Sequence, residues 1–178
     1  MHKYVAFLRA INVGGHIVKM DQLRLLFEET GLVNVETFIA SGNVIFDSRS
    51  AAAGLERKIE KHLKQNLGYE VATFLRTTAE LTAIAEYKPF RDAELSASSN
   101  RLYVGFLSDS PAKPAIDRVL SHSGAVDDFH VNGRELYWLC RKSFSESEVS
   151  GALLEKTLGM PATFRNVNTV RRLVAKYS

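Results

Sequence analysis

Two adjacent glycines and a lysine follow the first apolar run of the chain. Gly14 and Gly15 come shortly after Asn12, and Lys19 stands just before the next helical pattern. Adjacent glycines permit positive φ angles, so their backbone N–H groups can converge on an anion, and a lysine adds a positive charge. The segment has neither the GK[ST] ending of a Walker loop nor the GxGxxG order of a dinucleotide fingerprint. Its spacing therefore indicates either an anion-binding loop or a plain connection between strand and helix.

A second polar cluster comes directly before the last helical pattern of the chain. It runs Arg165-Asn166-Val167-Asn168-Thr169, and either asparagine can act as the N-cap of the helix. A helix start with basic neighbours attracts anions, because its first N–H groups have no partner inside the helix. Capping alone would account for the same residues, so the cluster indicates either an anion site or an ordinary helix start.

The third cluster is the short segment Ser41-Gly42-Asn43 between two strand patterns. Asn and Gly are typical of tight hairpin turns, so this segment needs no function to explain it. If the three clusters meet in space, they would surround a ligand with backbone donors, amides and fixed cations, without a carboxylate. The predicted ligand-binding residues are Arg9, Asn12, Gly14, Gly15, Lys19, Ser41, Gly42, Asn43, Arg165, Asn166, Asn168 and Thr169.

Metal and cysteine chemistry finds no support in the sequence. The histidines show neither HxxxH nor HExxH spacing, so we expect no metal site. Cys140 is the only cysteine, which excludes an intramolecular disulfide and a Cys-based zinc site. Its apolar neighbours predict a buried side chain. No pair of nucleophile and base can be named, so the sequence assigns neither a reaction nor a cofactor.

Composition places the chain among ordinary globular proteins. Of its 178 residues, 46% are hydrophobic and 24% are charged, and the net charge is +3. No apolar run approaches the roughly 18 residues that span a bilayer, and the N-terminal segment lacks the layout of a signal peptide. We therefore expect a cytoplasmic protein without a membrane contact. Residues 1–20 and 162–178 contain basic but no acidic residues, which predicts a positive field if the two ends come together.

The two halves of the chain carry the same order of strand and helix patterns. In the first half, Leu55, Ile59 and Leu63 recur every fourth residue, which places them on one face of a helix. Thr77 and Glu80 have the spacing of a capping box at the start of a short helix. We predict strands at 4–11, 33–40, 43–47 and 71–75, helices at 21–30, at 50–67 and from the Thr77 cap to Pro89, and a linker at 91–100.

The second half repeats this order. Asn132-Gly133 between two strand patterns is a strong hairpin signal, typical of a type I′ turn. Pro111 suits the first turn of a helix, and Ser145 with Glu148 has capping-box spacing for another. We predict strands at 101–107, 126–131, 135–140 and 162–164, helices beginning near Pro111 and Ser145, and a last helix with Val170, Leu173, Val174 and Tyr177 on one face.

Two successive βαββαβ units of roughly 80–90 residues fit the split-βαβ, ferredoxin-like arrangement. We therefore predict an α+β protein made of two tandem ferredoxin-like units with a C-terminal helix. The first unit would occupy residues 1–92, and the second, with the last helix, residues 97–178.

Four segments of the chain resemble a widespread bacterial family, the domain-of-unknown-function family numbered 1697. They are LRAINVGG at Leu8–Gly15, VKM at Val18–Met20, ASGNVIF at Ala40–Phe46 and RNVNTV at Arg165–Val170. The resemblance implies two ferredoxin-like units and marks the three polar clusters as shared motifs, without an assigned activity. Val167 stands where the C-terminal motif usually has Trp, so this chain has no aromatic ring there for stacking. Ala10 replaces the Gly that is usual in the first motif.

Three functions fit these observations. The first is binding of a small anionic ligand or nucleotide at the Gly-Gly loop and the start of the last helix. The second is a structural or partner-binding role, in which the clusters only join the two halves. The third, nucleic-acid binding on a sheet, is the weakest, because no segment matches the aromatic RNA-recognition pattern. In addition, Tyr103 and Phe106 alternate to opposite faces of their strand. Enzymatic activity and the number of subunits stay open at this stage.

Overall fold

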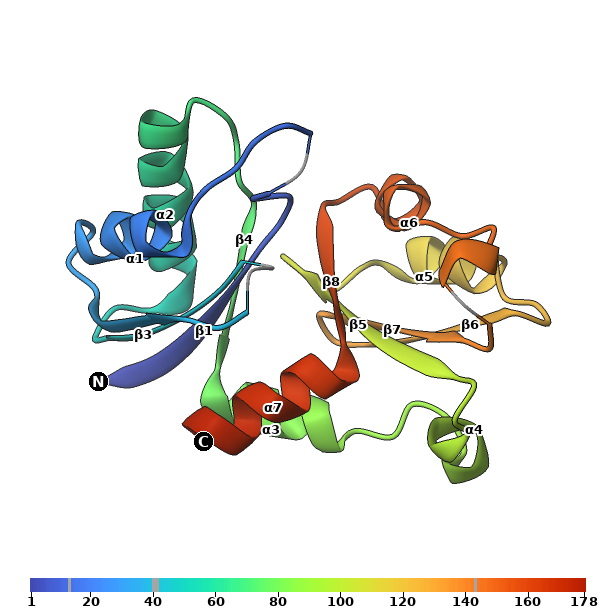
Figure 1. The fold of residues 1–178 in the computed structure, drawn as a ribbon. Coiled ribbons are helices and arrows are strands. Elements are labelled where there is room, and N and C mark those ends of the chain that lie inside the picture. The colour runs from blue at the N-terminus through green and yellow to red at the C-terminus, as the bar shows by residue number, and fades with distance from the viewer. Residues whose placement is uncertain (13, 40–41, 143) are drawn as a thin grey trace. The chain divides into compact units, whose positions relative to one another are not determined.

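The computed structural model describes residues 1–12, 14–39, 42–142 and 144–178. Contacts divide the chain into two compact units, and each unit holds one four-stranded antiparallel sheet (Figure 1). Unit 1 comprises Met1–Thr82 and Leu173–Ser178, and unit 2 comprises Ala83–Arg172. The chain is therefore an α+β protein, as the order of strand and helix patterns predicts.

The sheet of unit 1 has the strand order β2-β3-β1-β4. β1 pairs antiparallel with both β3 and β4, so the first strand of the chain lies inside the sheet. This position agrees with its near-continuous apolar sequence. The elements are β1 (His2–Leu8), α1 (Met20–Glu28), β2 (Val33–Thr37), β3 (Asn43–Ser48), α2 (Ala52–Leu67), β4 (Thr73–Thr77) and α3 (Thr78–Glu86), of which Ala83–Glu86 belong to unit 2.

The helices α1 and α2 pack on one face of this sheet (Figure 1). Leu55, Ile59 and Leu63 of α2 are buried, which confirms the prediction from their spacing. α2 ends at Gly68 in the left-handed conformation, where glycine has no steric penalty. The same core contains Leu23 and Phe27 of α1, alternate residues Tyr4, Ala6 and Leu8 of β1, and Val44 and Phe46 of β3.

The sheet of unit 2 has the equivalent strand order β6-β7-β5-β8. β5 pairs with β7 and β8, as β1 pairs with β3 and β4 in unit 1. The elements are α4 (Asp92–Ser96), β5 (Arg101–Leu107), α5 (Lys113–Leu120), β6 (Asp127–Asn132), β7 (Glu135–Cys140), the 3₁₀ turn η1 (Phe144–Glu146), α6 (Gly151–Leu158), β8 (Ala162–Asn166) and α7 (Val167–Tyr177), of which Leu173–Tyr177 belong to unit 1.

The core of unit 2 surrounds Trp138 of β7, which is fully buried. Its indole Nε1 donates a 2.7 Å hydrogen bond to Asp127 Oδ1, and Ser147 Oγ donates another of 2.7 Å to Oδ2 of the same carboxylate. Phe129 and Phe164 lie near the indole, at ring-centroid distances of 6.0 and 5.8 Å. The buried carboxylate is tolerated because both of its oxygens accept hydrogen bonds.

The β6–β7 hairpin is confirmed, with a loop one residue later than predicted. Asn132 pairs with Glu135, so the two loop residues are Gly133 and Arg134. Gly133 has φ +59°, whereas Arg134 is not in the left-handed region. A type I′ turn needs positive φ at both loop residues, so the predicted turn type is wrong; glycine at the first loop position is typical of type II′.

One of the two predicted capping boxes is formed. Thr77 N donates to Glu80 Oε2 at 2.7 Å, and Glu80 N donates to Thr77 Oγ1 at 3.2 Å. Ser145 does not start the next helix, because α6 is instead capped by Ser150, whose Oγ accepts from Leu153 N at 3.1 Å. Ser145 instead lies in the 3₁₀ turn η1, which is followed by Ser147, the residue that bonds to the buried carboxylate described above.

Several other boundaries differ from the prediction by two or three residues, for example β2, which ends at Thr37 rather than at residue 40, and β4, which begins at Thr73 rather than at residue 71. Two of the differences have a clear local cause. The first strand ends at Leu8 rather than at residue 11, because Ala10 has φ +58° and turns the chain out of the strand. α5 begins at Lys113, with Pro114 rather than Pro111 in its first turn. Proline is favoured in a first helical turn because its missing N–H would have no partner there.

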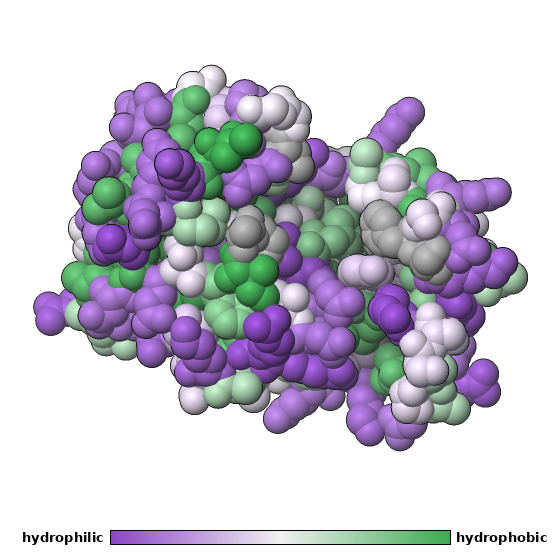
Figure 2. Space-filling model, in the orientation of Figure 1, coloured by the Kyte–Doolittle hydropathy of each residue, from purple (hydrophilic) through white to green (hydrophobic). Residues whose placement is uncertain are grey.

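The face of the molecule in Figure 2 is mostly hydrophilic, and its hydrophobic side chains form small separate patches. Among the described residues, the large apolar side chains that are most exposed are Met1, Ile17 and Leu25. Single exposed apolar side chains are common on protein surfaces, so they indicate no particular partner. None of the described helices is long and apolar enough to cross a membrane.

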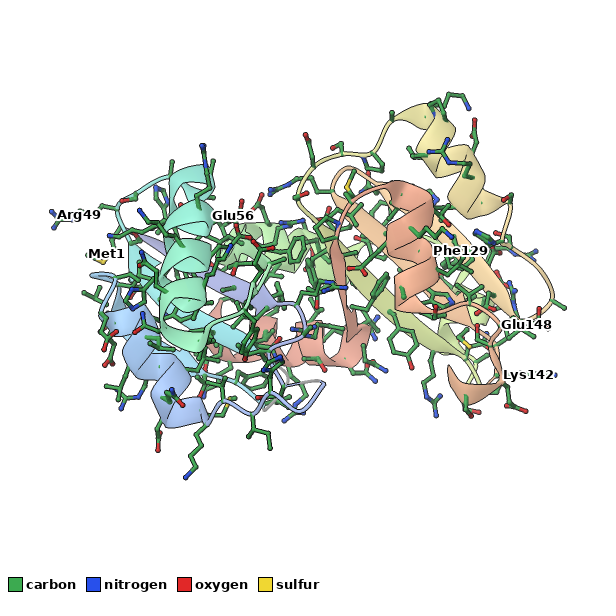
Figure 3. All side chains as sticks on the ribbon, turned by 90° about the horizontal axis from the view of Figure 1, so that it is seen from above. Met1, Arg49, Glu56, Phe129, Lys142 and Glu148 are labelled. Atoms are coloured by element: carbon green, nitrogen blue, oxygen red, sulfur yellow. The ribbon has the colours of Figure 1, made fainter. Side chains whose placement is uncertain are left out.

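Each sheet ends in an edge strand whose backbone donors are bound by glutamates of a neighbouring helix. In unit 1, Glu60 Oε1 accepts from Thr73 N at 2.9 Å, and Glu56, labelled in Figure 3, accepts from Leu75 N at 3.0 Å. In unit 2, Glu155 of α6 accepts from the first N–H of β8 at 2.9 Å. These carboxylates occupy donors that an added strand would need, so they protect the β4 edge of one sheet and the β8 edge of the other against strand addition.

Candidate anion-binding site

The loop after β1 in unit 1 carries the predicted Gly14-Gly15 pair. Both glycines are exposed, with φ angles of +64° and +84°, so this conformation favours glycine. Asn12 Oδ1 accepts a 2.7 Å hydrogen bond from Val18 N, which closes the loop at its base. Lys19 is exposed at the start of α1. The loop thus presents two glycines and one cation, while the oxygen of Asn12 is used within the loop.

Tyr69, which follows α2, fixes the position of this loop. Its hydroxyl donates a 3.1 Å hydrogen bond to Ile11 O, and its ring stacks on His16 with 3.9 Å between ring centroids. Burial raises the pKa of the Tyr69 hydroxyl, so the group stays protonated and remains a donor. Arg9 is half-buried, and its backbone N donates to Ala72 O at 2.9 Å. These contacts explain the position of the loop without a ligand.

The turn between β2 and β3 packs on the same loop. Gly42 O accepts a 2.9 Å backbone hydrogen bond from the last residue of β1. A Cβ atom at Gly42, where φ is +80°, would lie 2.8 Å from Ile11 Cγ2. Asn43 is fully buried, and its Nδ2 donates to Phe38 O at 2.8 Å. The structure therefore brings the first and third predicted clusters together within unit 1; the predicted Ser41 lies outside the described residues.

Arg165, near the end of β8 in unit 2, is buried. Its Nη1 donates to Thr163 Oγ1 at 2.8 Å and to Phe164 O at 2.9 Å. Burial lowers the pKa of Arg165 to about 10, because loss of solvation disfavours the charged form. These contacts are those of a structural residue, and its role in ligand binding stays a prediction.

The start of α7 opens onto a pocket of about 390 Å³ within unit 2. Asn166 Oδ1 accepts a 2.9 Å hydrogen bond from Asn168 N. Of the two asparagines predicted as candidate N-caps, Asn166 is therefore the one that caps α7. Arg101 from β5 and Arg171 from α7 bring two positive charges to the pocket, and none of its lining residues is acidic. Its remaining walls come from Asn100 and from the apolar side chains Leu95, Leu102 and Val167.

Both arginines of this pocket are exposed, and the oxygens that they contact among the described residues are neutral. Arg101 Nη1 donates to Ser98 O at 2.7 Å and to Asn100 O at 3.0 Å. Arg171 Nη1 lies 3.4 Å from Asn168 Oδ1. Within the described residues no carboxylate offsets these two positive charges, which lie near the first turn of α7, where Thr169 is half-buried.

The short helix α4 forms one wall of the pocket and lies in the segment predicted as a linker. Glu94 of α4 forms an ion pair with Arg141, and this contact raises the pKa of the Arg141 guanidinium. Asn100 Nδ2 donates to Glu94 O at 2.9 Å. The polar composition of residues 91–100 predicts a linker, and this prediction is wrong, because the segment contains α4. The helix is held by an ion pair with Arg141, which is distant in the sequence, so no local pattern indicates it.

Arg101 and Arg171 are the two site residues that sequence reasoning missed. The excess of basic residues at 162–178 includes Arg171, which was a usable signal. Arg101 is the first residue of a strand, and no local pattern connects it to α7. The antiparallel pairing of β5 with β8 brings it to this helix, because Tyr103 pairs with Asn166.

Metal and cysteine chemistry finds no site in the ranges that the structure describes. No group of three or more His, Cys, Asp or Glu side chains among these residues is placed to hold a metal ion. Cys140 is buried, as predicted, and burial raises the pKa of its thiol.

Another hollow of unit 2, of about 550 Å³, is lined by Lys142 and Glu148, which are labelled in Figure 3, and by Asp127. This hollow has charges of both signs and points to no single class of ligand.

Two four-stranded antiparallel sheets, each built in the order β-α-β-β-α-β, define the class of fold. The family model described as "Protein of unknown function (DUF1697)" matches residues 1–137, and the chain belongs to this family. This confirms the family resemblance, and three of the four segments that carried it lie within the matched residues, whereas RNVNTV at Arg165–Val170 lies after them. The matched residues include the Gly-Gly loop and end before α7.

A comparison with solved structures supports the same architecture. The chain is similar to the conserved bacterial protein SP0830 from Streptococcus pneumoniae, with a TM-score of 0.73 and 23% sequence identity. The match covers 99% of this chain and 98% of that chain. At this identity the likeness establishes the fold alone. A comparison with curated proteins finds no match.

Proposed function

We propose that the protein binds a small anionic ligand, inorganic or the phosphate group of a nucleotide, in the pocket at the start of α7. One observation carries this proposal: Arg101 and Arg171 line a pocket that has no acidic side chain. Within the described part of the chain, neither arginine forms an ion pair with a carboxylate. Two cations in one hollow repel each other, and an anion between them removes this repulsion.

The chemistry of the pocket suits a phosphate. A guanidinium presents several N–H donors in a planar fork that matches phosphate oxygens, and such charge-assisted hydrogen bonds are about twice as strong as neutral ones. The positive end of the α7 dipole adds to the same field. The side-chain amides of Asn100 and Asn168 supply further donors.

The Gly14-Gly15 loop of unit 1 is a second proposed anion contact. Its support is the exposed pair of glycines and the exposed Lys19. Asn12, Gly42 and Asn43 are engaged in the fold around it, so we assign them to the shape of the loop.

The proposal is tested by calorimetric titration with inorganic phosphate, together with thermal unfolding. A ligand at about 100 times its Kd adds roughly 2.7 kcal/mol to the free energy of unfolding, which raises Tm by about 5–10 °C for a chain of this size. We expect Arg101→Ala and Arg171→Ala each to weaken phosphate binding at least about tenfold, because each removes charge-assisted hydrogen bonds.

A matched control variant also removes one arginine, but at a position outside the pocket. Arg118→Ala removes an exposed arginine of α5 in the same unit, so phosphate affinity should stay the same. Equal affinity in the wild type and in both pocket variants would contradict the proposal, as would equal weakening by the control.

A structural role is the second candidate, and the buried Arg165 favours it. Its guanidinium bonds within β8 and is removed from solvent, so substitution should lower stability rather than affinity. Nucleic-acid binding gains less support, because Phe106 is fully buried and Tyr103 packs against Trp138 at 5.6 Å between ring centroids. Neither ring belongs to a stacking platform for bases.

The architecture adds two further proposals. We infer that each β-α-β-β-α-β segment is a ferredoxin-like repeat, because both sheets have the same strand order. As successive repeats of the sequence, the two domains would occupy residues 1–92 and 97–178. The compact units divide the chain differently, because contacts assign residues 83–92 to unit 2 and Leu173–Ser178 to unit 1. The cytoplasm stays the proposed compartment, because a chain with one cysteine has no intramolecular disulfide of the kind common in small secreted domains.

A further inference from the structure

A second hollow of about 540 Å³ adjoins the arginine pocket within unit 2. Leu95 and Arg171 line both hollows, so Arg171 stands where they join. We infer that the ligand is a phosphate monoester whose uncharged ring group, such as a nucleoside, lies in this second hollow. The inference rests on the proposed function, because the phosphate would lie in the arginine pocket.

The second hollow differs from the first in its charge. Glu86 and Asp92 line it together with the cations Lys88 and Arg171, so charges of both signs are present in equal number. Lys88 Nζ also forms a 2.9 Å ion pair with Asp92 Oδ1. A second phosphate would meet two carboxylates here, whereas an uncharged group with donors and acceptors would not be repelled.

Apolar surface is available beside these polar groups. Ala85, Tyr87 and Leu95 line the second hollow, and the two hollows lie within the size range of small-molecule sites. A sugar and a base combine flat apolar surface with hydrogen-bonding edges, which is the combination that this lining presents. The proposed ligand therefore has its charge at one end and its ring at the other.

The walls of the second hollow are fixed before any ligand binds. On one side, α4 is anchored through the ion pair between Glu94 and Arg141. On the other, Tyr87 Oη lies 2.7 Å from His130 Nε2, and the tyrosine ring packs on Tyr137 at 5.1 Å between ring centroids. A preformed site loses less entropy on binding, so the ring group should add affinity instead of only being tolerated.

The test is a calorimetric titration of the full chain with inorganic phosphate, adenosine monophosphate, uridine monophosphate and adenosine. We expect at least one nucleoside monophosphate to bind tenfold or more tightly than phosphate. Ser96, at the exposed end of α4, lines the second hollow and not the arginine pocket, so Ser96→Phe should fill space in the second hollow alone. It should reduce the affinity for the monophosphate to that for phosphate and leave phosphate binding unchanged. Ser123→Phe, at an exposed serine after α5, is the matched control.

The outcomes separate this inference from the proposed function. If phosphate binds and neither monophosphate binds more tightly, the second hollow holds no ring group and the inference is overturned while the proposed function stands. If Ser96→Phe and Ser123→Phe affect the monophosphate equally, the inference is also overturned. If neither phosphate nor a monophosphate binds, or Arg171→Ala changes nothing, the proposed function itself fails.

Discussion

The two units contain the same strand-to-helix junction, and its two copies differ in one carboxylate. β4 leads into α3 in unit 1, and β8 leads into α7 in unit 2. Arg76 and Arg165 have the same place in this junction: each is buried, and each Nη1 donates to the carbonyl of the preceding residue, at 2.8 and 2.9 Å. Both strands also pair with the first strand of their sheet in the same register, Arg76 opposite Val5 and Arg165 opposite Val104.

The copies differ in the first turn of the helix that follows. In unit 1, Glu80 accepts from Thr77 N and completes a capping box, so a carboxylate of the protein itself lies at the positive end of α3. In unit 2, Thr169 has the position that Glu80 has in α3, and no acidic residue lies in the first turn of α7. In unit 1 the carboxylate of Glu80 thus offsets the positive helix end. In unit 2 no carboxylate of the first turn does so, and Arg101 and Arg171 add two positive charges beside the helix start.

The largest effect is expected from the buried arginine of this junction. Arg165→Ala should lower the free energy of unfolding by about 3 kcal/mol, because it opens a cavity and removes the donor for Thr163 Oγ1 and Phe164 O. Urea unfolding measures this loss. Arg76→Ala should cause a similar loss if the two junctions are equivalent, and a loss in one variant only would contradict their equivalence.

The effect of the carboxylate on binding is tested by introducing one into the first turn of α7. Thr169→Glu would give α7 the capping-box spacing of Thr77 and Glu80, with Asn166 as the cap. We expect phosphate affinity to fall at least about tenfold, because the new carboxylate competes for the positive helix end. Thr169→Gln controls for size without charge and should keep most of the affinity. Unchanged affinity in Thr169→Glu would contradict an anion at the helix start.

The pH dependence of stability reports the burial of Arg165. The folded-state pKa of Arg165 is about 10, well below the ordinary value of an arginine. Both the folded and the unfolded state are therefore charged below pH 10, and there the burial of the charge destabilises the folded state in full. Above pH 10 the folded state releases its proton before the unfolded chain does. The wild type should therefore gain stability relative to Arg165→Met, by up to about 1.4 kcal/mol per pH unit as the pH rises above 10. Urea midpoints measured from pH 9 to 11 give this difference, and a constant difference would show that Arg165 does not lose its charge.

Local sequence signals predicted the elements of both units better than the site. Neighbouring residues predict the apolar face of α2, the end of this helix at residue 67 and the limits of the strand Glu135–Cys140, and the structure confirms all three. Ala10 is also instructive, because its φ of +58° explains why glycine suits this position of the family motif.

The site depends on contacts that no local pattern contains. Arg165 has the residue type of an anion ligand, yet strand pairing places it inside the unit. Arg101 and Arg171 are distant in sequence and meet only because β5 lies beside β8, the strand that leads into α7. The linker prediction failed for the same reason, since α4 depends on the ion pair between Glu94 and Arg141.

The smallest effect is expected from the reverse change, Glu80→Thr in unit 1. It removes the carboxylate that accepts from Thr77 N, so the free energy of unfolding should fall by about 0.5–1 kcal/mol. Urea unfolding resolves this change, and Glu80→Gln should recover part of it because glutamine can still accept the bond.

Glu80→Thr should not create a phosphate site in unit 1. The register that aligns Tyr4 with Tyr103 places His2 where unit 2 has Arg101, and Thr82 where α7 has Arg171. The variant therefore exposes a helix start without the two guanidinium groups. Titration with phosphate should show the same number of sites as in the wild type. A new site in Glu80→Thr would mean that an open helix start is sufficient, and the arginines would then not be what distinguishes the two junctions.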